Sequence, residues 1–155
     1  MRARNVPVPE AHLVALAAGA ALHRVRPWRL ALPVPVRGAA GAAALTAGLL
    51  LVAASVRAAG PVHLARPTAL ATTGPYATRR HPMYVAWALL HLGTGLLRGS
   101  AWVVVTLPVA TAWTHVEAVH EERALAARFP DEYPGYQAVV PRYVAVRGRG
   151  RLVQC

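Results

Sequence analysis

The chain contains no lysine, a single cysteine and only six acidic residues among its 155 positions. The lone thiol, Cys155, excludes an internal disulfide and a cysteine-based metal cluster. Charged residues make up 15% of the chain while 55% of it is hydrophobic, which is too apolar for an ordinary soluble domain with one core. The composition therefore predicts an integral membrane protein.

The seventeen basic residues are all arginines, and they are scattered between apolar runs rather than gathered together. A nucleic-acid-binding protein concentrates its basic residues in a patch or stripe. Membrane topology explains the scattered pattern better, so we expect no nucleic-acid partner. The absence of lysine and the excess of alanine are typical of a GC-rich genome, and we expect a bacterial source.

Four apolar stretches predict an all-α membrane bundle of about four transmembrane helices in a single domain, residues 1–155. The spans are expected at residues 11–25, 39–59, 82–97 and 101–119. The first span is short for a bilayer core of about 30 Å. It lacks a small-residue cleavage site, so we interpret it as an anchor. Prolines between Arg24 and Arg37 predict a loop there.

Small residues on the second span would let a neighbouring helix approach closely, namely Gly41, Ala44 and Gly48. A tight turn at residues 98–100 joins the third and fourth spans, which should form a helical hairpin. Residues 117–129 mix acids and bases with apolar positions, which predicts an amphipathic helix at the lipid headgroups. A C-terminal interfacial helix should then lie over the hairpin with three tyrosines, Tyr133, Tyr136 and Tyr143.

The distribution of the arginines predicts an orientation. With both chain ends in the cytoplasm, the outer side would hold Arg24, Arg26, Arg29, Arg37 and Arg98. The other arginines would lie on the inner side, in agreement with the positive-inside rule, although the four in the first loop weaken that agreement. We therefore expect a bacterial inner-membrane protein in which residues 74–84 and the region of Glu121 both emerge on the cytoplasmic face.

The segment at residues 74–84, GPYATRRHPMY, is the strongest candidate for a functional site. Proline fixes φ and disfavours helix at the residue before it, so Pro82 should begin a helix with Arg80 and His81 at its entrance. Unpaired N–H groups and the helix dipole favour an anion there, and the adjacent cations strengthen this preference. Two adjacent carboxylates follow about forty residues later, Glu121 and Glu122. They could hold the opposite charge.

Several short motifs occur in a defined order after residue 74. They are RHPMY at residues 80–84, a hairpin of two spans, EER at residues 121–123 and FPDEYPGYQAVVPR at residues 129–142. In this order they resemble the membrane methyltransferases of the isoprenylcysteine carboxyl methyltransferase and phospholipid methyltransferase group. The resemblance covers residues 74–142, which we take as the cofactor-binding part of the domain.

The resemblance implies an S-adenosylmethionine site at the cytosolic end of the third and fourth spans, with a lipophilic substrate entering from the bilayer. The residues that match the family's cofactor-binding motif and paired acids are Arg80, His81, Pro82, Tyr84, Glu121 and Glu122. The cofactor's carboxylate suits a cation, while its ammonium, ribose hydroxyls and sulfonium suit carboxylates. Tyr76 and Tyr84 could flank the adenine.

The chain departs from the family pattern in its C-terminal part. Relatives usually carry an arginine cluster, proposed to contact the substrate, where this chain has Gln137, Ala138 and Val139. Glu132 is retained as a candidate substrate-side or catalytic group, and Arg142 could substitute for the missing arginines. The departure leaves carboxyl, amine, thiol and hydroxyl acceptors open for a small lipophilic or lipid-like substrate.

Other interpretations compete with an enzyme. Arg79 and Arg80 could be topological anchors, the paired acids could form a solvated helix face, and a non-catalytic membrane scaffold would retain much of this sequence. A haem or metal protein would need its histidines at one depth, whereas His91 and His115 differ by about 12 Å along the hairpin. His115 and His120 are five residues apart and point to different sides of a helix, so we expect no metal site.

Overall fold

The computed structural model describes residues 10–60 and 68–144. Its elements are α1 (Glu10–Val25), α2 (Val34–Ala59), the 3-10 helix η2 (Gly74–Ala77), α3 (Pro82–Arg98), α4 (Ala101–Arg128) and α5 (Tyr133–Val139). The described ranges contain helices and no strand, which confirms the all-α prediction. Cys155 and six of the arginines predicted to lie on the inner side fall outside these ranges, namely Arg2, Arg4, Arg66, Arg147, Arg149 and Arg151.

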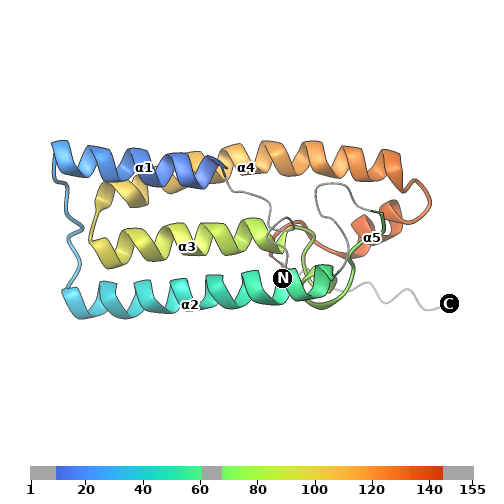
Figure 1. Cartoon of the computed structure of the whole chain (residues 1–155), viewed down its shortest axis with the longest axis horizontal. Helices are drawn as coiled ribbons and strands as arrows, with labels where there is room; N and C mark the ends of the chain where they lie inside the picture. Colours follow the sequence, from blue (N-terminus) through green and yellow to red (C-terminus); the bar gives the residue numbers. More distant parts are fainter. Residues whose placement is uncertain (1–9, 61–67, 145–155) are drawn as a thin grey trace.

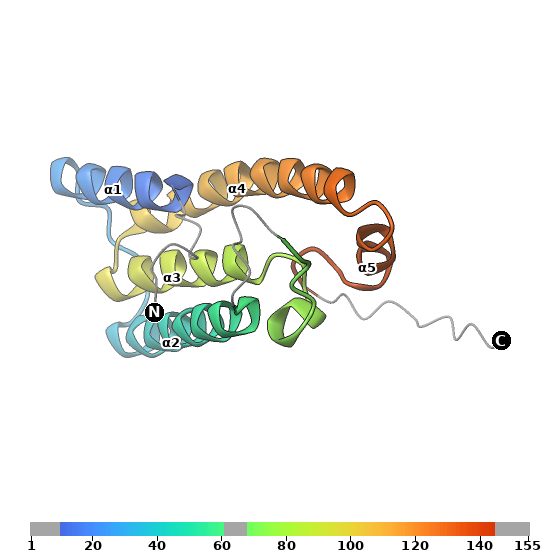
Figure 2. The same ribbon diagram turned by 45° about the vertical axis from the view of Figure 1, so that its right-hand side comes forward.

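Four of the helices form a bundle with roughly parallel long axes (Figure 1). α2 packs against α3, α3 against α4, and α4 against α1. The C-terminal half of α4 extends past the N-terminal end of α1, and the chain then turns back through α5, as Figure 2 shows from a second side. The last described residues therefore return to the start of α3 rather than leaving the bundle.

Glycines permit the close packing of α2 on α3. A Cβ atom on Gly41 would lie 2.8 Å from Leu97 Cγ, and one on Gly48 would lie 3.0 Å from the Ala86 carbonyl oxygen. On the opposing helix, a Cβ on Gly93 would lie 2.9 Å from the Gly41 carbonyl oxygen. Backbone therefore meets backbone at this interface, and the prediction that small residues of the second span admit a neighbouring helix is confirmed.

Helix α2 begins earlier than the sequence suggested. It starts at Val34 instead of residue 39, inside the stretch expected to be a loop. Pro35 occupies the first turn, where backbone N–H groups have no intrahelical partner, so a proline there removes no hydrogen bond. At the other end of the chain, α4 continues unbroken past residue 119 to Arg128, as the amphipathic pattern predicted.

Two helices, α2 and α4, are long and apolar enough to cross a membrane by length and composition, with mean hydropathies of 2.0 and 1.2 over their most apolar windows. Only 17% and 22% of the residues in those windows are buried inside the protein, so most positions of each window are at least partly exposed. Leu49, Leu50 and Val109 each expose more than half of their surface. Lipid would solvate such surfaces, which supports a membrane protein. α1 and α3 have 16 and 17 residues, so the four-span count stays a prediction.

Candidate functional site

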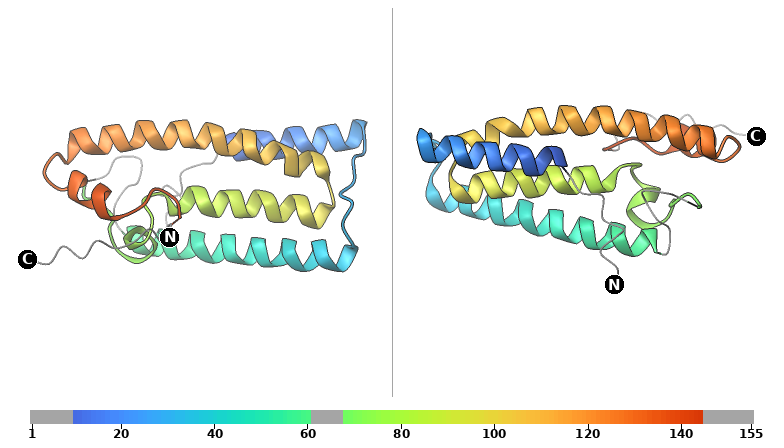
Figure 3. Two further views of the ribbon diagram at one scale, coloured as in Figure 1. Left: turned by 180° about the vertical axis from the view of Figure 1, so that it is seen from behind. Right: turned by 45° about the horizontal axis from the view of Figure 1, so that its top comes forward.

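The site lies where the start of α3, the C-terminal half of α4 and the segment after α5 meet (Figure 3). Pro82 takes the first position of α3, as predicted, and His81 is the residue before the helix. The backbone N–H groups of Arg80 and His81 donate to the carbonyl oxygens of Pro141 and Arg142 at 2.9 and 3.0 Å. We call residues 140–144 the C-terminal strap, because this backbone pairing holds them across the helix entrance.

Glu122 is the centre of the polar cluster. Its carboxylate is 5% exposed and accepts two hydrogen bonds from Arg142, Nε at 2.8 Å and Nη2 at 2.7 Å. Arg80 approaches the same carboxylate through Nε and Nη2, both at 3.1 Å. His81 Nε2 lies 3.0 Å from Glu122 Oε1. One buried acid on α4 thus binds both the C-terminal strap and residues 80–82 before and at the start of α3, which we call the RHP loop.

The pKa of Glu122 reflects these contacts. Burial alone would raise its pKa, but the hydrogen bond from Arg142, the charge of Arg80 and the contact with His81 together lower it to about 2. Glu122 is therefore ionised at neutral pH. Arg80 also donates to the backbone carbonyls of Gln137 and Val140, at 2.9 and 2.7 Å. Its guanidinium therefore has hydrogen-bond partners inside the protein in addition to Glu122.

Glu121, the neighbouring acid, has a different environment. Its side chain is 41% exposed, and no arginine pairs with it among the described residues. Tyr84 donates its hydroxyl to Glu121 Oε2 at 3.3 Å, and His81 Nδ1 lies 3.5 Å from the same oxygen. Successive residues of an α-helix point about 100° apart, so one acid faces the protein interior while the other faces a hollow beside it.

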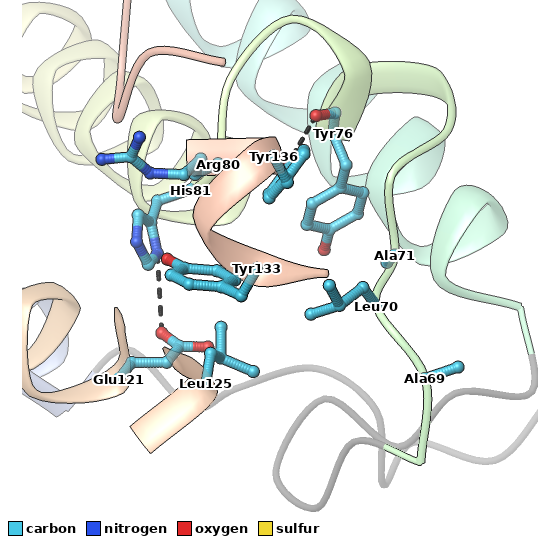
Figure 4. A pocket seen from close by; sticks show the side chains of 10 residues that line it. All are labelled: Ala69, Leu70, Ala71, Tyr76, Arg80, His81, Glu121, Leu125, Tyr133 and Tyr136. Carbon is cyan, nitrogen blue, oxygen red and sulfur yellow. Dashed lines mark hydrogen bonds and ion pairs between the residues drawn. The ribbon is translucent and has the colours of Figure 1, made fainter. Parts of the chain in front are cut away.

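That hollow is lined by an acid, a cation, tyrosines and small apolar side chains (Figure 4). The residues that line it are Ala69, Leu70, Ala71, Tyr76, Arg80, His81, Glu121, Leu125, Tyr133 and Tyr136. The cavity measures about 50 Å³, which is room for one or two water molecules. Burial, with a smaller effect of the Glu121 charge, raises the pKa of Tyr76 to about 12, so its hydroxyl stays protonated at neutral pH.

A second and more open hollow of about 400 Å³ lies on the other side of Arg80. Its lining consists of Arg80 and residues 137–142. The positions where the family resemblance led us to look for arginines therefore face a hollow next to the polar cluster. In this chain they present neutral side chains, and Gln137 Nε2 donates to Glu122 Oε2 at 3.4 Å.

The structure brings most of the predicted site residues together. The grouped residues are Tyr76, Arg80, His81, Pro82, Tyr84, Glu121, Glu122 and Arg142. Glu132 is separate, because it is exposed and precedes α5, with no side-chain contact to the cluster. The binding and catalytic roles assigned to all of these residues stay predictions.

Sequence reasoning missed the tyrosines that build the hollow's walls. Tyr133 is 1% exposed, and the Tyr136 hydroxyl donates to the Tyr76 carbonyl oxygen at 2.7 Å. Both had been assigned to the membrane interface. The spacing of Tyr133 and Tyr136 by three residues on a short helix places them on one face, and that signal could have marked them as a wall.

A buried histidine pair was also missed. His12 Nδ1 lies 3.1 Å from His91 Nδ1, and both side chains are almost fully buried between α1 and α3. His91 Nε2 donates to the Val103 carbonyl oxygen at 2.9 Å, because a carbonyl can only accept. His91 Nδ1 is then the acceptor and His12 Nδ1 the donor. His115, which we had weighed against His91, instead contacts the Tyr143 hydroxyl at 3.0 Å.

Comparisons with known proteins give one family match and one curated relative. The sequence profile of the phospholipid methyltransferase family matches residues 36–132. The cobalt-zinc-cadmium resistance protein CzcN of Cupriavidus metallidurans is 37% identical over 75 residues, which cover 48% of this chain and 34% of that protein. The chain thus spans about a third of the length of the curated relative it matches. No solved structure matches.

Proposed function

Because the chain belongs to the phospholipid methyltransferase family, we propose that it is an S-adenosylmethionine-dependent membrane methyltransferase acting on a small lipophilic or lipid-like acceptor. The observation that carries the proposal is the difference in environment between the two adjacent acids. Glu122 is fully engaged by arginines, whereas Glu121 keeps an exposed carboxylate beside a tyrosine-lined hollow. An acid of that kind suits a small organic cation.

The chemistry of the hollow fits the proposed cofactor. S-adenosylmethionine carries a positive sulfonium and a positive ammonium, and both are attracted by a carboxylate and by aromatic faces. Glu121 supplies the carboxylate, and Tyr76, Tyr133 and Tyr136 supply aromatic rings in the same lining. We therefore assign cation binding to Glu121, and adenine stacking to the tyrosine walls.

Arg80 and His81 suit the cofactor's carboxylate, but their present contacts are internal. Arg80 donates to Glu122 and to two backbone carbonyls, and the enclosed space of about 50 Å³ is far smaller than a nucleoside. Binding therefore requires the walls of this hollow to move apart, and contact of Arg80 with the ligand would replace its present bonds to Glu122 and to the two carbonyl oxygens. The bound cofactor would supply a methyl group for in-line transfer to the acceptor, with S-adenosylhomocysteine as the leaving group.

The chain's own residues have to align the acceptor with that methyl group and exclude water. The hollow lined by residues 137–142 adjoins Arg80 and is the proposed approach for the acceptor. Its side chains at Gln137, Ala138 and Val139 are neutral, and the two arginines in its lining, Arg80 and Arg142, already pair with Glu122. Carboxyl, amine, thiol and hydroxyl acceptors therefore all remain candidates, and we propose that they arrive from the bilayer on the cytoplasmic side.

Calorimetric binding of S-adenosylhomocysteine to detergent-purified protein tests this assignment. We expect saturable binding by the wild type, and loss of most of it in Glu121→Ala, because that exposed side chain can be removed without unfolding the cluster. Asp131→Ala is the matched control, since Asp131 is an exposed acid outside the hollow. Unchanged affinity in folded Glu121→Ala protein would show that the cation site is elsewhere.

A non-catalytic scaffold is the second candidate, and one observation favours it. The polar cluster is closed by its own ion pairs, so the fold satisfies its buried charges without any ligand. Absence of binding by well-folded wild-type protein in the same calorimetric experiment would support the scaffold. Binding that depends on Glu121 would support the enzyme.

A further inference from the structure

The end of the bundle opposite the candidate site carries arginines without acids. It is formed by residues 22–37, from the last turn of α1 to the first turn of α2, and by residues 96–102, around the turn between α3 and α4. We call these two segments the far end. These segments contain five arginines, namely Arg24, Arg26, Arg29, Arg37 and Arg98. They contain none of the chain's acidic residues. This excess of positive charge plays no part in the proposed methyl transfer.

The far end is a fixed structure. The Leu30 N–H donates to the Gly99 carbonyl oxygen at 3.0 Å, and the Ala101 N–H donates to the Trp28 carbonyl oxygen at 2.9 Å. Trp102 Nε1 donates to the Arg26 carbonyl oxygen at 2.7 Å. These three bonds join the first connection to the second, so the side chains between them are held in a defined arrangement.

Four of the five arginines point their charge outward. Arg37 donates to the Leu97 carbonyl oxygen at 2.9 Å and thereby caps α3. The other four are exposed, namely Arg24, Arg26, Arg29 and Arg98, and none of them has an ion-pair partner among the described residues. Their positive field is not neutralised by the described part of the protein, and it suits an anion.

One of these arginines, Arg26, lines an aromatic hollow. Trp28 and Trp102 meet edge to face with ring centroids 5.2 Å apart, and Trp28 is 49% exposed. Together with Arg26 and Pro27 they line a hollow of about 460 Å³. Tryptophan prefers the boundary between lipid headgroups and acyl chains, because its ring is apolar and its N–H is polar.

Exposed aliphatic side chains lie beside the arginines and identify the kind of partner. They include Leu22, Val25, Leu32, Val34 and Val36, with exposed fractions from 43% to 86%. A free phosphate ion would satisfy the arginines but leave these side chains in water. A phospholipid satisfies both, since its headgroup carries the anion and its acyl chains cover the aliphatic side chains.

We propose that the far end binds the phosphate headgroup of an anionic phospholipid, in the leaflet away from the candidate site. Arg26 and the two tryptophans form the central contact, and the other exposed arginines add electrostatic attraction. Each arginine near an anionic surface contributes about fivefold in affinity. The proposal concerns a binding site and does not depend on methyltransferase activity.

The test uses tryptophan fluorescence in vesicles. A Trp87→Phe/Trp113→Phe background leaves Trp28 and Trp102 as reporters, and its circular dichroism should match that of the wild type. The full chain is reconstituted into phosphatidylcholine vesicles that contain an equal minor share of acyl-brominated phosphatidylglycerol or acyl-brominated phosphatidylcholine. We expect stronger quenching by the brominated phosphatidylglycerol, because the anionic lipid is enriched around the reporters.

Replacing the arginines should remove this preference. In Arg26→Gln/Arg29→Gln protein we expect the preference for phosphatidylglycerol to fall by more than tenfold, because each of the two arginines contributes about fivefold. Arg123→Gln, an exposed arginine on the site-side half of α4, is the matched control and should retain the preference. Equal quenching by the two lipids, or an unchanged preference in the double variant, would overturn the proposal. Competition by inorganic phosphate would identify a soluble-anion site and would overturn the lipid assignment.

Discussion

The two ends of this bundle use arginine in opposite ways. At the site end, Arg80 and Arg142 both pair with one buried acid, Glu122, so their charges hold the fold together. At the far end, Arg26 and Arg29 are exposed, with no acid in either segment that forms that end. The difference teaches that charge count alone does not locate a ligand. At the site end the group left available is an acid, and at the far end the groups left available are cations.

The largest effect should come from removing the acid at the centre of the site end. Glu122→Ala leaves Arg80 and Arg142 without their partner, and Arg80 is nearly buried with 10% of its side chain exposed. Breaking a buried ion pair from one side costs about 3 to 5 kcal/mol. Thermal unfolding in detergent, followed by circular dichroism, should show a large loss of stability.

The neighbouring position is the control for this prediction. Glu121→Ala removes the same side chain one residue earlier, where it is 41% exposed and lacks an arginine partner among the described residues. Its unfolding temperature should stay close to that of the wild type. Equal destabilisation by the two substitutions would contradict the separate roles we assign to the two acids.

Acidification should weaken the site end by a smaller amount, because it removes only the charge of Glu122. The pKa of this carboxyl is about 2 in the folded protein against an ordinary value of 4.5. A lowered folded-state pKa stabilises the protein fully above the ordinary value, and this contribution is lost as pH falls from about 4.5 to 2.

The measurement compares wild type with Glu122→Gln across this pH range. The stability advantage of the wild type should be constant above about pH 5.5, a unit beyond the ordinary value, and should shrink below it. Glutamine cannot ionise, so the variant controls for the other titrating groups. An advantage that stays constant down to pH 2 would show that the charge of Glu122 contributes nothing.

The smallest effect is expected at the far end, whose shape depends on a backbone turn. Gly99 has a φ of +61°, and a Cβ there would lie 2.6 Å from Arg37 Nη1. Gly99→Ala should cost about 1 to 2 kcal/mol, because other residues resist this left-handed conformation. Gly135→Ala on α5 is the matched control, since nothing lies within 4 Å of its Cβ and an alanine there favours the helix. Equal unfolding temperatures for the two variants would contradict the role of this turn.

The meeting of the RHP loop with the paired acids could be predicted from the sequence. Two spans joined by a tight turn form a hairpin, and that topology returns residue 121 to the level of residue 81. The structure confirms the contact, with His81 Nε2 3.0 Å from Glu122. The proline at the helix start and the tight turn of the hairpin are both recognised from local sequence, so this contact could be predicted without knowledge of tertiary packing.

The division between Glu121 and Glu122 could not be predicted. Adjacent helical residues differ by about 100° in direction, and the choice of which one faces inward depends on how α4 is rotated against α3. Arg142 illustrates the same limit. The sequence suggested Arg142 as a replacement for missing substrate-side arginines, and this role stays a prediction; its ion pair with Glu122 at 2.7 Å was not foreseen.

The pairing of His12 with His91 shows a further limit. Sequence reasoning considered His91 only against His115, because those two lie on the predicted hairpin. The register of α1 was unknown, and α1 contributes the partner instead. A contact between residues 79 positions apart depends on the packing of the whole bundle, which periodicity alone does not supply.

The C-terminal strap has a consequence for the order in which the protein is made. Arg80 binds the carbonyl oxygen of Val140, 60 residues later in the chain, and Arg142 completes the ring around Glu122. During synthesis Arg80 and Glu122 are joined to the chain before Val140 and Arg142 are. Until the strap packs in place, Glu122 has Arg80 and His81 as partners, and water or lipid headgroups must take the place of Arg142. The C-terminal strap, which is translated after both helices of the hairpin, therefore completes the polar cluster, and a chain released before Pro141 would lack that part of it.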